Sequence, residues 1–283
     1  MQLSTLYLEE DDSFIRLTGG LRRRYGGDLS FPALPRHRAV VIGNFVQSID
    51  GVVSLKLPGK SGGADISGRN QEDTFVMGLL RAVADAVLIG EETFRTAAGH
   101  VWTADFIYPE LAEEFQAFRR ELGKPAPHPI NVIVSGAGRV DLQQPLFRRD
   151  DVRSLVLTTK QGEEALKMRF GRVLPARVHV LPGERLIRSQ DIVASLHSEY
   201  GVQCLLHEGG PMLFSSFLAE RVVDQLFLTM APQIVGQGRH RERPAFSGAA
   251  SFGADDALWT RLVSVKRAAT GHLFLCYRFA SAP

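Results

Sequence analysis

The sequence predicts an α/β protein with a mostly parallel central sheet, helices on both faces and an antiparallel hairpin at its C-terminal end. First, apolar runs alternate with amphipathic helical segments between residues 39 and 220, which is typical of a parallel sheet. Second, this alternation stops after residue 220, and three strand-like runs follow. Third, the last two runs are joined by the short connection 267–271, which predicts an antiparallel hairpin at the sheet edge.

The first strand and helix are defined by contrasting patterns. Residues 39–46 form one apolar run, which predicts a buried strand, and the glycine-rich segment 59–63 predicts a flexible loop. A helix is expected over residues 69–84, because its apolar residues recur with the helical period: Phe75, Val76, Leu79, Leu80 and Val83.

The other elements follow from the same patterns. Short apolar runs predict strands at residues 86–90, 131–135, 154–159, 177–181, 205–208, 224–231, 262–267 and 271–279. Helical spacing predicts helices at residues 111–122, 162–170, 192–200 and 211–220. Ser189 is the expected N-cap of the third of these helices.

The chain is expected to form a single domain. Residues 1–38 contain an acidic patch and an arginine run, and are interpreted as an N-terminal extension packed on the main domain. Residues 39–283 form the main domain, because no linker separates two cores. Within it, the polar segment 97–128 is interpreted as an insertion.

Composition argues against several classes of protein. A hydrophobic content of 45%, a charged content of 23% and a net charge of +2 are typical of a soluble globular protein. The basic clusters 22–24 and 239–241 are short and lack stacking aromatics, so no nucleic-acid partner is expected. No apolar run reaches the length of a membrane span, and no secretory signal is visible. Cys204 and Cys276 lie in apolar runs without a CxxC pattern, so we expect no metal site and a cytoplasmic protein.

The most informative motif is Glu208-Gly209-Gly210-Pro211, at the end of an apolar run. Two glycines let a ligand approach the backbone closely, and proline suits the first position of a helix. The free amides of that first turn favour an anion such as phosphate. A plain strand-to-helix turn without a ligand is the alternative.

Two common nucleotide motifs are absent. The segment 59–61 resembles the end of a Walker A loop, but Ser54 stands where its first glycine belongs. The segment 136–138 resembles the start of a Rossmann fingerprint, but Asp141 replaces its third glycine. Small residues at three strand ends, near residues 90, 135 and 209, instead favour one extended dinucleotide across the carboxyl edge of the sheet.

Several segments together resemble the reductase domain of riboflavin biosynthesis, the C-terminal half of the bifunctional deaminase–reductase. Residues 44–51 (NFVQSIDG) resemble its S-[LI]-D-G signature, and residues 80–93 (LRAVADAVLIGEET) resemble its LR-x-x-x-DA-x-L-x-G-x-x-T segment. The motifs EGGP at 208–211, VDQ at 223–225, AP at 231–232 and GHLF at 271–274 follow in the family's order. The resemblance covers about residues 39–280.

This resemblance implies a dihydrofolate-reductase-like three-layer fold, NADPH as cofactor and a homodimer. It implies reduction of the ribosyl group of 5-amino-6-(5-phosphoribosylamino)uracil to a ribityl chain. The matching positions for cofactor binding are Gly90, Glu92, Thr93, Ser135, Gly209, Gly210, Pro211 and Met212, with Arg139 as a candidate for the 2′-phosphate. Those on the substrate side are Asn44, Ser48 and Ser67. The dimer interface is not identified: residues 226–230 and 273–277 are either partner contacts or internal sheet.

Two departures affect the expected substrate site. Asn44 stands where the family carries lysine, and residues 95–102 replace the segment that contains a substrate-binding arginine. Among the possible substitutes, Arg69 in a glycine-flanked loop is the best candidate, Arg95 is another, and Arg81 is most simply a helix-surface residue. His100 and Trp102 are further candidates for the substrate side.

Asp50 and Glu208 are the acids expected at the crevice, one to orient the substrate and the other to deliver a proton. The alternative for Asp50 is a turn residue before Gly51. His207 is expected to be a strand residue that faces the helix layer. Two other functions remain open: reduction of another heterocycle, such as dihydrofolate or a pterin, and nucleotide binding without turnover.

Overall fold

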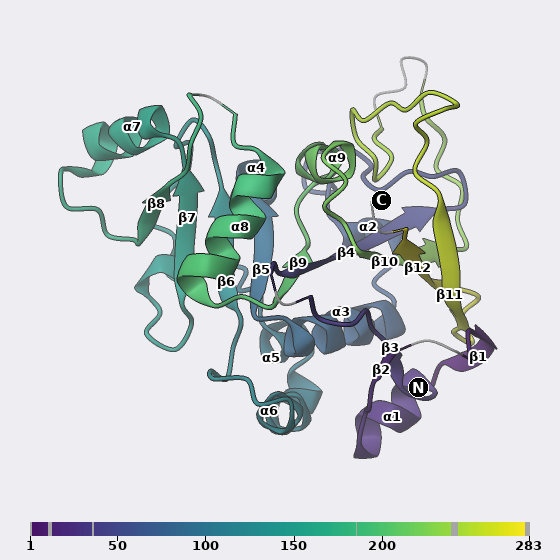
Figure 1. Cartoon of the computed structure of the whole chain (residues 1–283). Coiled ribbons are helices and arrows are strands. Elements are labelled where there is room, and N and C mark those ends of the chain that lie inside the picture. Colours follow the sequence, from purple (N-terminus) through teal and green to yellow (C-terminus); the bar gives the residue numbers. More distant parts are fainter. Residues whose placement is uncertain (1, 11–12, 36, 185, 239–242, 281–283) are drawn as a thin grey trace.

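The computed structural model describes residues 2–10, 13–35, 37–184, 186–238 and 243–280. Ten strands form one sheet in the order β1-β11-β12-β10-β4-β9-β5-β6-β7-β8 (Figure 1). Their bounds are β1 Ser4–Leu8, β4 Val40–Ser48, β5 Ala86–Gly90, β6 Ile130–Val134, β7 Ser154–Thr158, β8 Val178–Val180, β9 Cys204–His207, β10 Gln225–Ala231, β11 Thr260–Arg267 and β12 Leu273–Phe279. A separate small ribbon pairs β2 (Phe14–Ile15) with β3 (Leu29–Ser30).

The sheet is parallel from β10 to β8 and antiparallel from β10 to β1. The helices are α1 Gly19–Tyr25, α2 Gly63–Ile66, α3 Gln71–Val83, α4 Glu91–Thr96, α5 Ala104–Ile107, α6 Ala112–Glu121, α7 Lys160–Phe170, α8 Ser189–Tyr200 and α9 Pro211–Ala219, with short 3-10 turns η1 Pro109–Leu111 and η2 Pro145–Arg148. This arrangement confirms the predicted α/β class with a mostly parallel sheet and antiparallel C-terminal strands.

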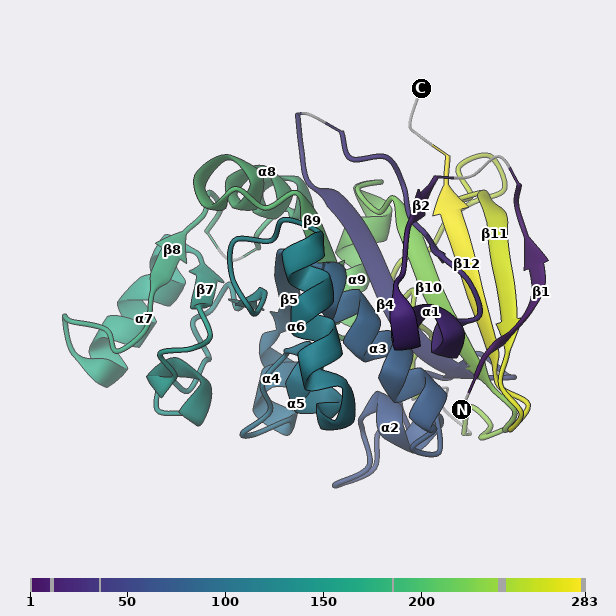
Figure 2. The same ribbon diagram turned by 90° about the horizontal axis from the view of Figure 1, so that it is seen from below.

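Both faces of the parallel strands other than the edge strand β8 are buried, which explains their continuous apolar sequences. Successive strand residues point to opposite faces, so Val87 and Ile89 of β5 join one apolar cluster and Ala86 and Leu88 join another. The first cluster includes residues of α1, α3 and α6, and the second includes residues of α8 and α9. Figure 2 shows α3 and α6 side by side, with α1 near α3.

The N-terminal segment adds a strand to the sheet. β1 pairs antiparallel with β11, so the predicted hairpin does not form the sheet edge, which β1 occupies instead. Leu21 and Tyr25 of α1 are buried in the first apolar cluster. Lys266 of β11 is also buried, and its ammonium lies 4.4 Å from the centre of the Tyr25 ring and 3.0 Å from the Gly26 carbonyl oxygen. The extension is therefore held by apolar packing, strand pairing and a cation–π contact.

Two other expectations need correction. The predicted cap of α8 is wrong: Arg188 is the N-cap residue, and the Glu220 carboxylate accepts hydrogen bonds from the backbone amides of Ser189 and Gln190, each at 2.9 Å. The segments 226–230 and 273–277 belong to β10 and β12, which are both paired on two sides. They are therefore internal strands whose edges are both paired within this chain.

Among the described residues, none of the helices has the length and apolarity needed to cross a lipid bilayer. The basic cluster 239–241 lies outside the described residues. The cluster 22–24 belongs to α1, where Arg22 is paired with Asp28 at 3.1 Å.

Two aspartates of the family motifs, Asp85 and Asp224, accept hydrogen bonds from backbone amides at the starts of strands. Asp85 accepts hydrogen bonds from the amides of Gln203 and Cys204, at 3.0 and 2.9 Å, and from Lys124 Nζ at 2.8 Å. Asp224 accepts a bond from the Val41 amide at 2.8 Å and pairs with Arg38. Each aspartate therefore connects the start of a strand to a neighbouring segment.

We expect Asp85→Ala to lower the free energy of unfolding by about 2–3 kcal/mol, because it leaves two strand amides and an ammonium without their acceptor. Urea unfolding followed by circular dichroism measures this. Asp151→Ala, which removes a carboxylate paired with Arg149 on the surface, is the control and should cost under about 1 kcal/mol. Equal losses in the two variants would contradict the structural role of Asp85.

Candidate functional site

The glycine turn lies where two parallel strands end. The Glu208 amide, just beyond β9, donates to the Leu88 carbonyl of β5 at 3.0 Å. A Cβ on Gly209 would lie 3.3 Å from the Gly90 nitrogen, and one on Gly210 would lie 3.4 Å from Thr93 Oγ1. The structure thus brings together four of the predicted cofactor residues. A Cβ on Gly209 would also lie 2.9 Å from His207 Cε1 and 3.1 Å from Leu213 Cδ2, so close packing requires glycine where β5 and β9 end.

Pro211 begins α9, with Gly210 as its N-cap. The turn therefore has the predicted strand–glycine–helix geometry, which points free amides away from the helix. The Met212 side chain is 65% exposed beside it. His207 is fully buried, with its ring centre 4.9 Å from that of Phe214 and 4.7 Å from that of Phe217 in α9. This confirms the expectation that it faces the helix layer, and burial lowers its pKa to about 3.

Glu208 forms a buried ion pair with Arg81 of α3. Arg81 Nη2 lies 2.7 Å from Glu208 Oε2, and Arg81 Nε lies 3.2 and 3.1 Å from the two carboxylate oxygens. The two side chains are 2% and 7% exposed. Arg81 is therefore not a helix-surface residue, as the sequence suggested. It does not replace the missing substrate arginine, because its guanidinium is already bound.

The remaining guanidinium nitrogen of Arg81 connects this pair to the insertion. Nη1 donates to the Thr103 carbonyl at 3.2 Å and lies 3.3 Å from His100 Nε2. Because arginine has no acceptor atom, His100 Nε2 must accept this bond, which places the ring proton on Nδ1. Burial, and then the charge of Arg81, lower the pKa of His100 to about 3. His100 thus supports Arg81, while Trp102 is buried in the first apolar cluster.

Asp73, in the first turn of α3, is a site residue that the sequence did not reveal. Its side chain is buried and hydrogen-bonded to the hydroxyls of Thr229 and Ser67. Burial raises the pKa of Asp73 to about 6, and the nearby charge of Glu208 acts in the same direction. Acidic residues are common in the first turn of helices, where they favour the helix dipole. The sequence pattern alone therefore did not distinguish Asp73 from an exposed acid.

The β11–β12 turn positions Ser67 beside Asp73. His272 Nε2 lies 3.0 Å from the Ser67 carbonyl oxygen, which fixes Nε2 as the donor. Thr270 Oγ1 lies 3.0 Å from His272 Nδ1 and accepts a bond from Asn70 Nδ2 at 2.9 Å. Asn70 in turn caps α3 by accepting a bond from the Asp73 amide at 2.8 Å. This chain explains the His272 of the GHLF motif.

Asp50 occupies a turn at the end of β4. Its carboxylate accepts bonds from Ser48 Oγ at 2.6 Å and from the Gly236 amide at 2.7 Å. Gly51 adopts φ of +82°, and its amide donates to the Ser48 carbonyl at 3.0 Å. The hydrogen bond from Ser48, together with the backbone amides of Val235 and Gly236, lowers the pKa of Asp50. These contacts favour the turn interpretation: Asp50 stays ionised and holds the loop after β10.

The other predicted residues lie around this edge. Asn44 is half-buried on β4 opposite Phe227 of β10. Arg69 is exposed between α2 and α3, in the left-handed region with φ of +58°. Arg95 pairs with Glu92 at 2.6 Å on the surface of α4, with both side chains about two-thirds exposed. The exposed guanidinium of Arg69 remains the candidate for a substrate phosphate.

At the ends of β5 and β6, Ser135 and Arg139 share one partner. Ser135 Oγ donates to the Glu91 carboxylate, and Arg139 binds the other oxygen of that carboxylate through Nε at 3.0 Å and Nη2 at 2.7 Å. The Arg139 amide also donates to Ser135 Oγ at 2.9 Å. The two predicted residues are thus brought together by a third, Glu91, which the sequence analysis did not assign.

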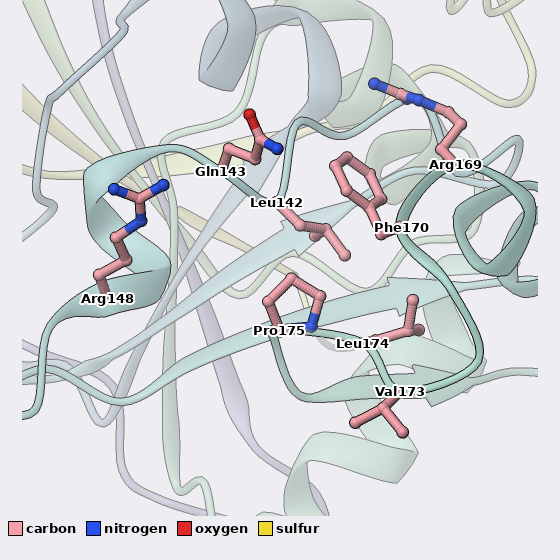
Figure 3. Close-up of a pocket in the computed structure, with 8 residues that line it drawn as sticks. All are labelled: Leu142, Gln143, Arg148, Arg169, Phe170, Val173, Leu174 and Pro175. Atoms are coloured by element: carbon pink, nitrogen blue, oxygen red, sulfur yellow. The ribbon is translucent and has the colours of Figure 1, made fainter.

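A groove of about 580 Å³ lies away from these residues (Figure 3). It lies between η2 and the segment that follows α7, and it is lined by Leu142, Gln143, Arg148, Arg169, Phe170, Val173, Leu174 and Pro175. None of the predicted site residues lines it. We do not assign the functional site to this groove, because the motif residues converge at the carboxyl edge of the sheet.

Comparison with known proteins gives the same family as the motifs. The model of the RibD C-terminal domain matches residues 39–272. A 2,5-diamino-6-ribosylamino-4(3H)-pyrimidinone 5′-phosphate reductase of Archaeoglobus fulgidus is 28% identical over 182 residues, which are 64% of this chain and 76% of the relative. The riboflavin biosynthesis protein RibD of Aquifex aeolicus is 26% identical over 208 residues, 74% of this chain and 50% of that protein.

A solved structure supports the fold. A pyrimidine reductase-like protein of Corynebacterium diphtheriae aligns with a TM-score of 0.64 at 23% identity, over 86% of this chain and 93% of the other. The family match covers the whole parallel part of the sheet and both sides of the candidate site. The chain therefore belongs to the RibD C-terminal domain family, the reductases of riboflavin biosynthesis.

Proposed function

We propose that this protein reduces the ribosyl group of a 6-ribosylaminopyrimidine 5′-phosphate to a ribityl group, with NADPH as the hydride donor. The family match and the reductases among the relatives support the reaction class. The observation that carries the proposal is that the glycine turn before α9 and the buried acids Asp73 and Glu208 lie at one edge of the sheet. A homodimer and a cytoplasmic location stay predictions.

The residues present fit a nicotinamide dinucleotide. Gly90, Gly209 and Gly210 lie together at the ends of β5 and β9, and α9 begins beside them, with its Leu213 side chain against Gly90 and Gly209. A pyrophosphate is the group that such a turn accommodates, through amides and the helix dipole. Pro211, Met212, Thr93 and Glu92 would flank it, with Ser135 and Arg139 at the adenosine end. When bound, the reduced nicotinamide supplies the hydride.

The reaction also requires a proton. Hydride addition at C1 of the ribosyl group breaks the bond to the ring oxygen, which must then take up a proton. Asp50 is held as an anion by its donors, and Glu208 is bound by the Arg81 guanidinium. Asp73, whose pKa is about 6, is the carboxyl suited to hold a proton near neutral pH. In this proposal Glu208 and Asp50 orient the substrate, and Asp73 holds the proton that the ring oxygen takes up.

Substrate recognition would use the adjoining residues. Ser48, Ser67 and Asn44 lie on β4 or beside α3, next to the acids. Arg69 would bind the 5′-phosphate, because its guanidinium is exposed at the α2–α3 connection. This placement leaves Arg81 to hold Glu208 in a fixed orientation.

Oxidation of NADPH at 340 nm tests the proposal directly. We expect turnover with 5-amino-6-(5-phosphoribosylamino)uracil or its 2-amino pyrimidinone counterpart, and the comparison of the two identifies the preferred ring. Arg69→Gln should raise KM for the phosphorylated substrate about tenfold or more with little change in kcat, since it removes uniform binding. Turnover with dihydrofolate alone, or dinucleotide binding without turnover of any of the three compounds, would contradict the proposal.

A further inference from the structure

The carboxylate of Glu91 stands at the position where the adenosine half of a dinucleotide would lie. The acids of the substrate side belong to α3 and the end of β9, and the glycine turn lies between β9 and β5. A dinucleotide with its pyrophosphate on that turn therefore extends toward the ends of β5 and β6. Ser135, Arg139 and Glu91 meet there.

The charges at this position do not favour a phosphate. Arg139 lies beside Ser135, and both its Nε and its Nη2 are bound to Glu91. The Glu91 side chain is 26% exposed, so its carboxylate is partly shielded from water, whereas the Arg139 side chain is 76% exposed. Glu92, the next residue, is paired with Arg95 at 2.6 Å, so the charge that opposes a phosphate here is that of Glu91. A 2′-phosphate dianion placed here must displace Glu91 from Arg139 and then lie beside it.

A ribose 2′-hydroxyl, unlike a phosphate, needs a hydrogen-bond acceptor. It donates a hydrogen bond, and in Rossmann-type sites a carboxylate accepts it, whereas an arginine accommodates the 2′-phosphate. Glu91 offers such an acceptor without losing its bonds from Ser135 and Arg139, since a carboxylate has about four lone-pair sites.

We infer that Glu91 is the residue that sets cofactor selectivity in this chain, by accepting the 2′-hydroxyl of NADH and by withholding Arg139 from the 2′-phosphate of NADPH. The inference rests on the proposed dinucleotide site. The protein consequently binds NADPH no more tightly than NADH, and removing the Glu91 charge shifts its selectivity toward NADPH.

Calorimetric titration with the oxidised dinucleotides NAD⁺ and NADP⁺ measures this without turnover. The wild-type dissociation constant for NADP⁺ should be equal to or larger than that for NAD⁺. Glu91→Gln should raise the affinity for NADP⁺ relative to NAD⁺ about tenfold or more, because Arg139 becomes available. In Glu91→Gln/Arg139→Gln that gain should disappear. Glu163→Gln, which breaks a similarly exposed glutamate pair with Lys167 on α7, is the matched control and should leave both constants unchanged.

The outcomes separate the inference from the proposed function. A wild-type dissociation constant that is smaller for NADP⁺ than for NAD⁺ beyond the error of the titration, or a ratio unchanged in Glu91→Gln while both dinucleotides bind, overturns the role of Glu91 alone. Failure of the wild-type protein and of every variant to bind either dinucleotide overturns the cofactor site and the role of Glu91 together.

Discussion

Arg81→Met is expected to lower the free energy of unfolding by about 3–5 kcal/mol, the usual cost of removing one partner from a buried ion pair. The Glu208 carboxylate would then remain almost fully buried without the three guanidinium contacts that it accepts at 2.7, 3.1 and 3.2 Å. His100 Nε2 and the Thr103 carbonyl would lose their donor as well. Urea denaturation followed by tryptophan fluorescence and circular dichroism measures the loss.

Two further variants identify the cause. Arg81→Met/Glu208→Leu removes both charges, and it should recover most of the lost stability, because a buried ion pair is often replaceable by apolar side chains. Arg95→Met breaks an exposed pair with Glu92 and should cost less than about 1 kcal/mol. A double variant as unstable as Arg81→Met would show that packing, and not the unpaired charge, carries the effect.

The loss of unfolding free energy in Arg81→Met should also depend on pH. An unpaired buried carboxyl favours its protonated form, so the folded variant would bind a proton that the unfolded chain releases at the same pH. The variant therefore becomes relatively more stable as pH falls from 8 to 5. A deficit that is constant over this range would contradict burial of an unpaired charge.

The sequence predicted the sheet well because burial on two faces produces continuous apolar runs. Residues 86–90 show this: the run has no polar residue, and β5 has the same bounds. The edge elements were less predictable. β1 lies in a segment with charged residues on one side, and its five residues are all exposed. Only its pairing with β11, a contact between distant parts of the chain, makes it a strand.

The glycine turn was predictable for a similar reason, since its properties are those of the backbone. Gly209 and Gly210 follow an apolar run and precede a proline, so the strand–turn–helix geometry can be read from adjacent residues. Partnerships between charged side chains were not predictable. Arg81 was expected on the helix surface because arginine is rarely buried, and no local spacing connects it to Glu208, which is 127 residues away. The partner of Arg139 is likewise distant, as Glu91 precedes it by 48 residues.

Asp73→Asn is expected to lower kcat by about a hundredfold or more, which is the usual contribution of a positioned proton donor. The substitution keeps the size of the side chain and its place against Thr229 and Ser67 but removes the exchangeable carboxyl proton. The substrate KM should change much less, because the lost interaction is one made in the transition state. Steady-state NADPH oxidation measures both constants.

Unfolding is not the expected cause of this loss. The pKa of Asp73 is raised from 3.8 to about 6 in the folded protein. Its contribution to stability is therefore full below about pH 3.8 and is lost as pH rises through about 6. Above that pH the wild-type protein buries an ionised carboxylate, so the asparagine variant should be no less stable at pH 8 than the wild type. A large loss of stability at pH 8 would argue for a structural role instead.

The pH profile distinguishes a proton donor from a merely structural acid. In the wild type, kcat/KM should fall above about pH 6, as Asp73 loses its proton. The hydroxyl of Thr229 stabilises the ionised form of Asp73 and so lowers its pKa. Thr229→Val removes that hydroxyl, so the fall of kcat/KM should move to higher pH. Asp73→Asn should abolish the fall. A fall that stays in place in Thr229→Val, or persists in Asp73→Asn, would require another group to deliver the proton, because the hydroxyl of Thr229 acts on the titration through Asp73 itself.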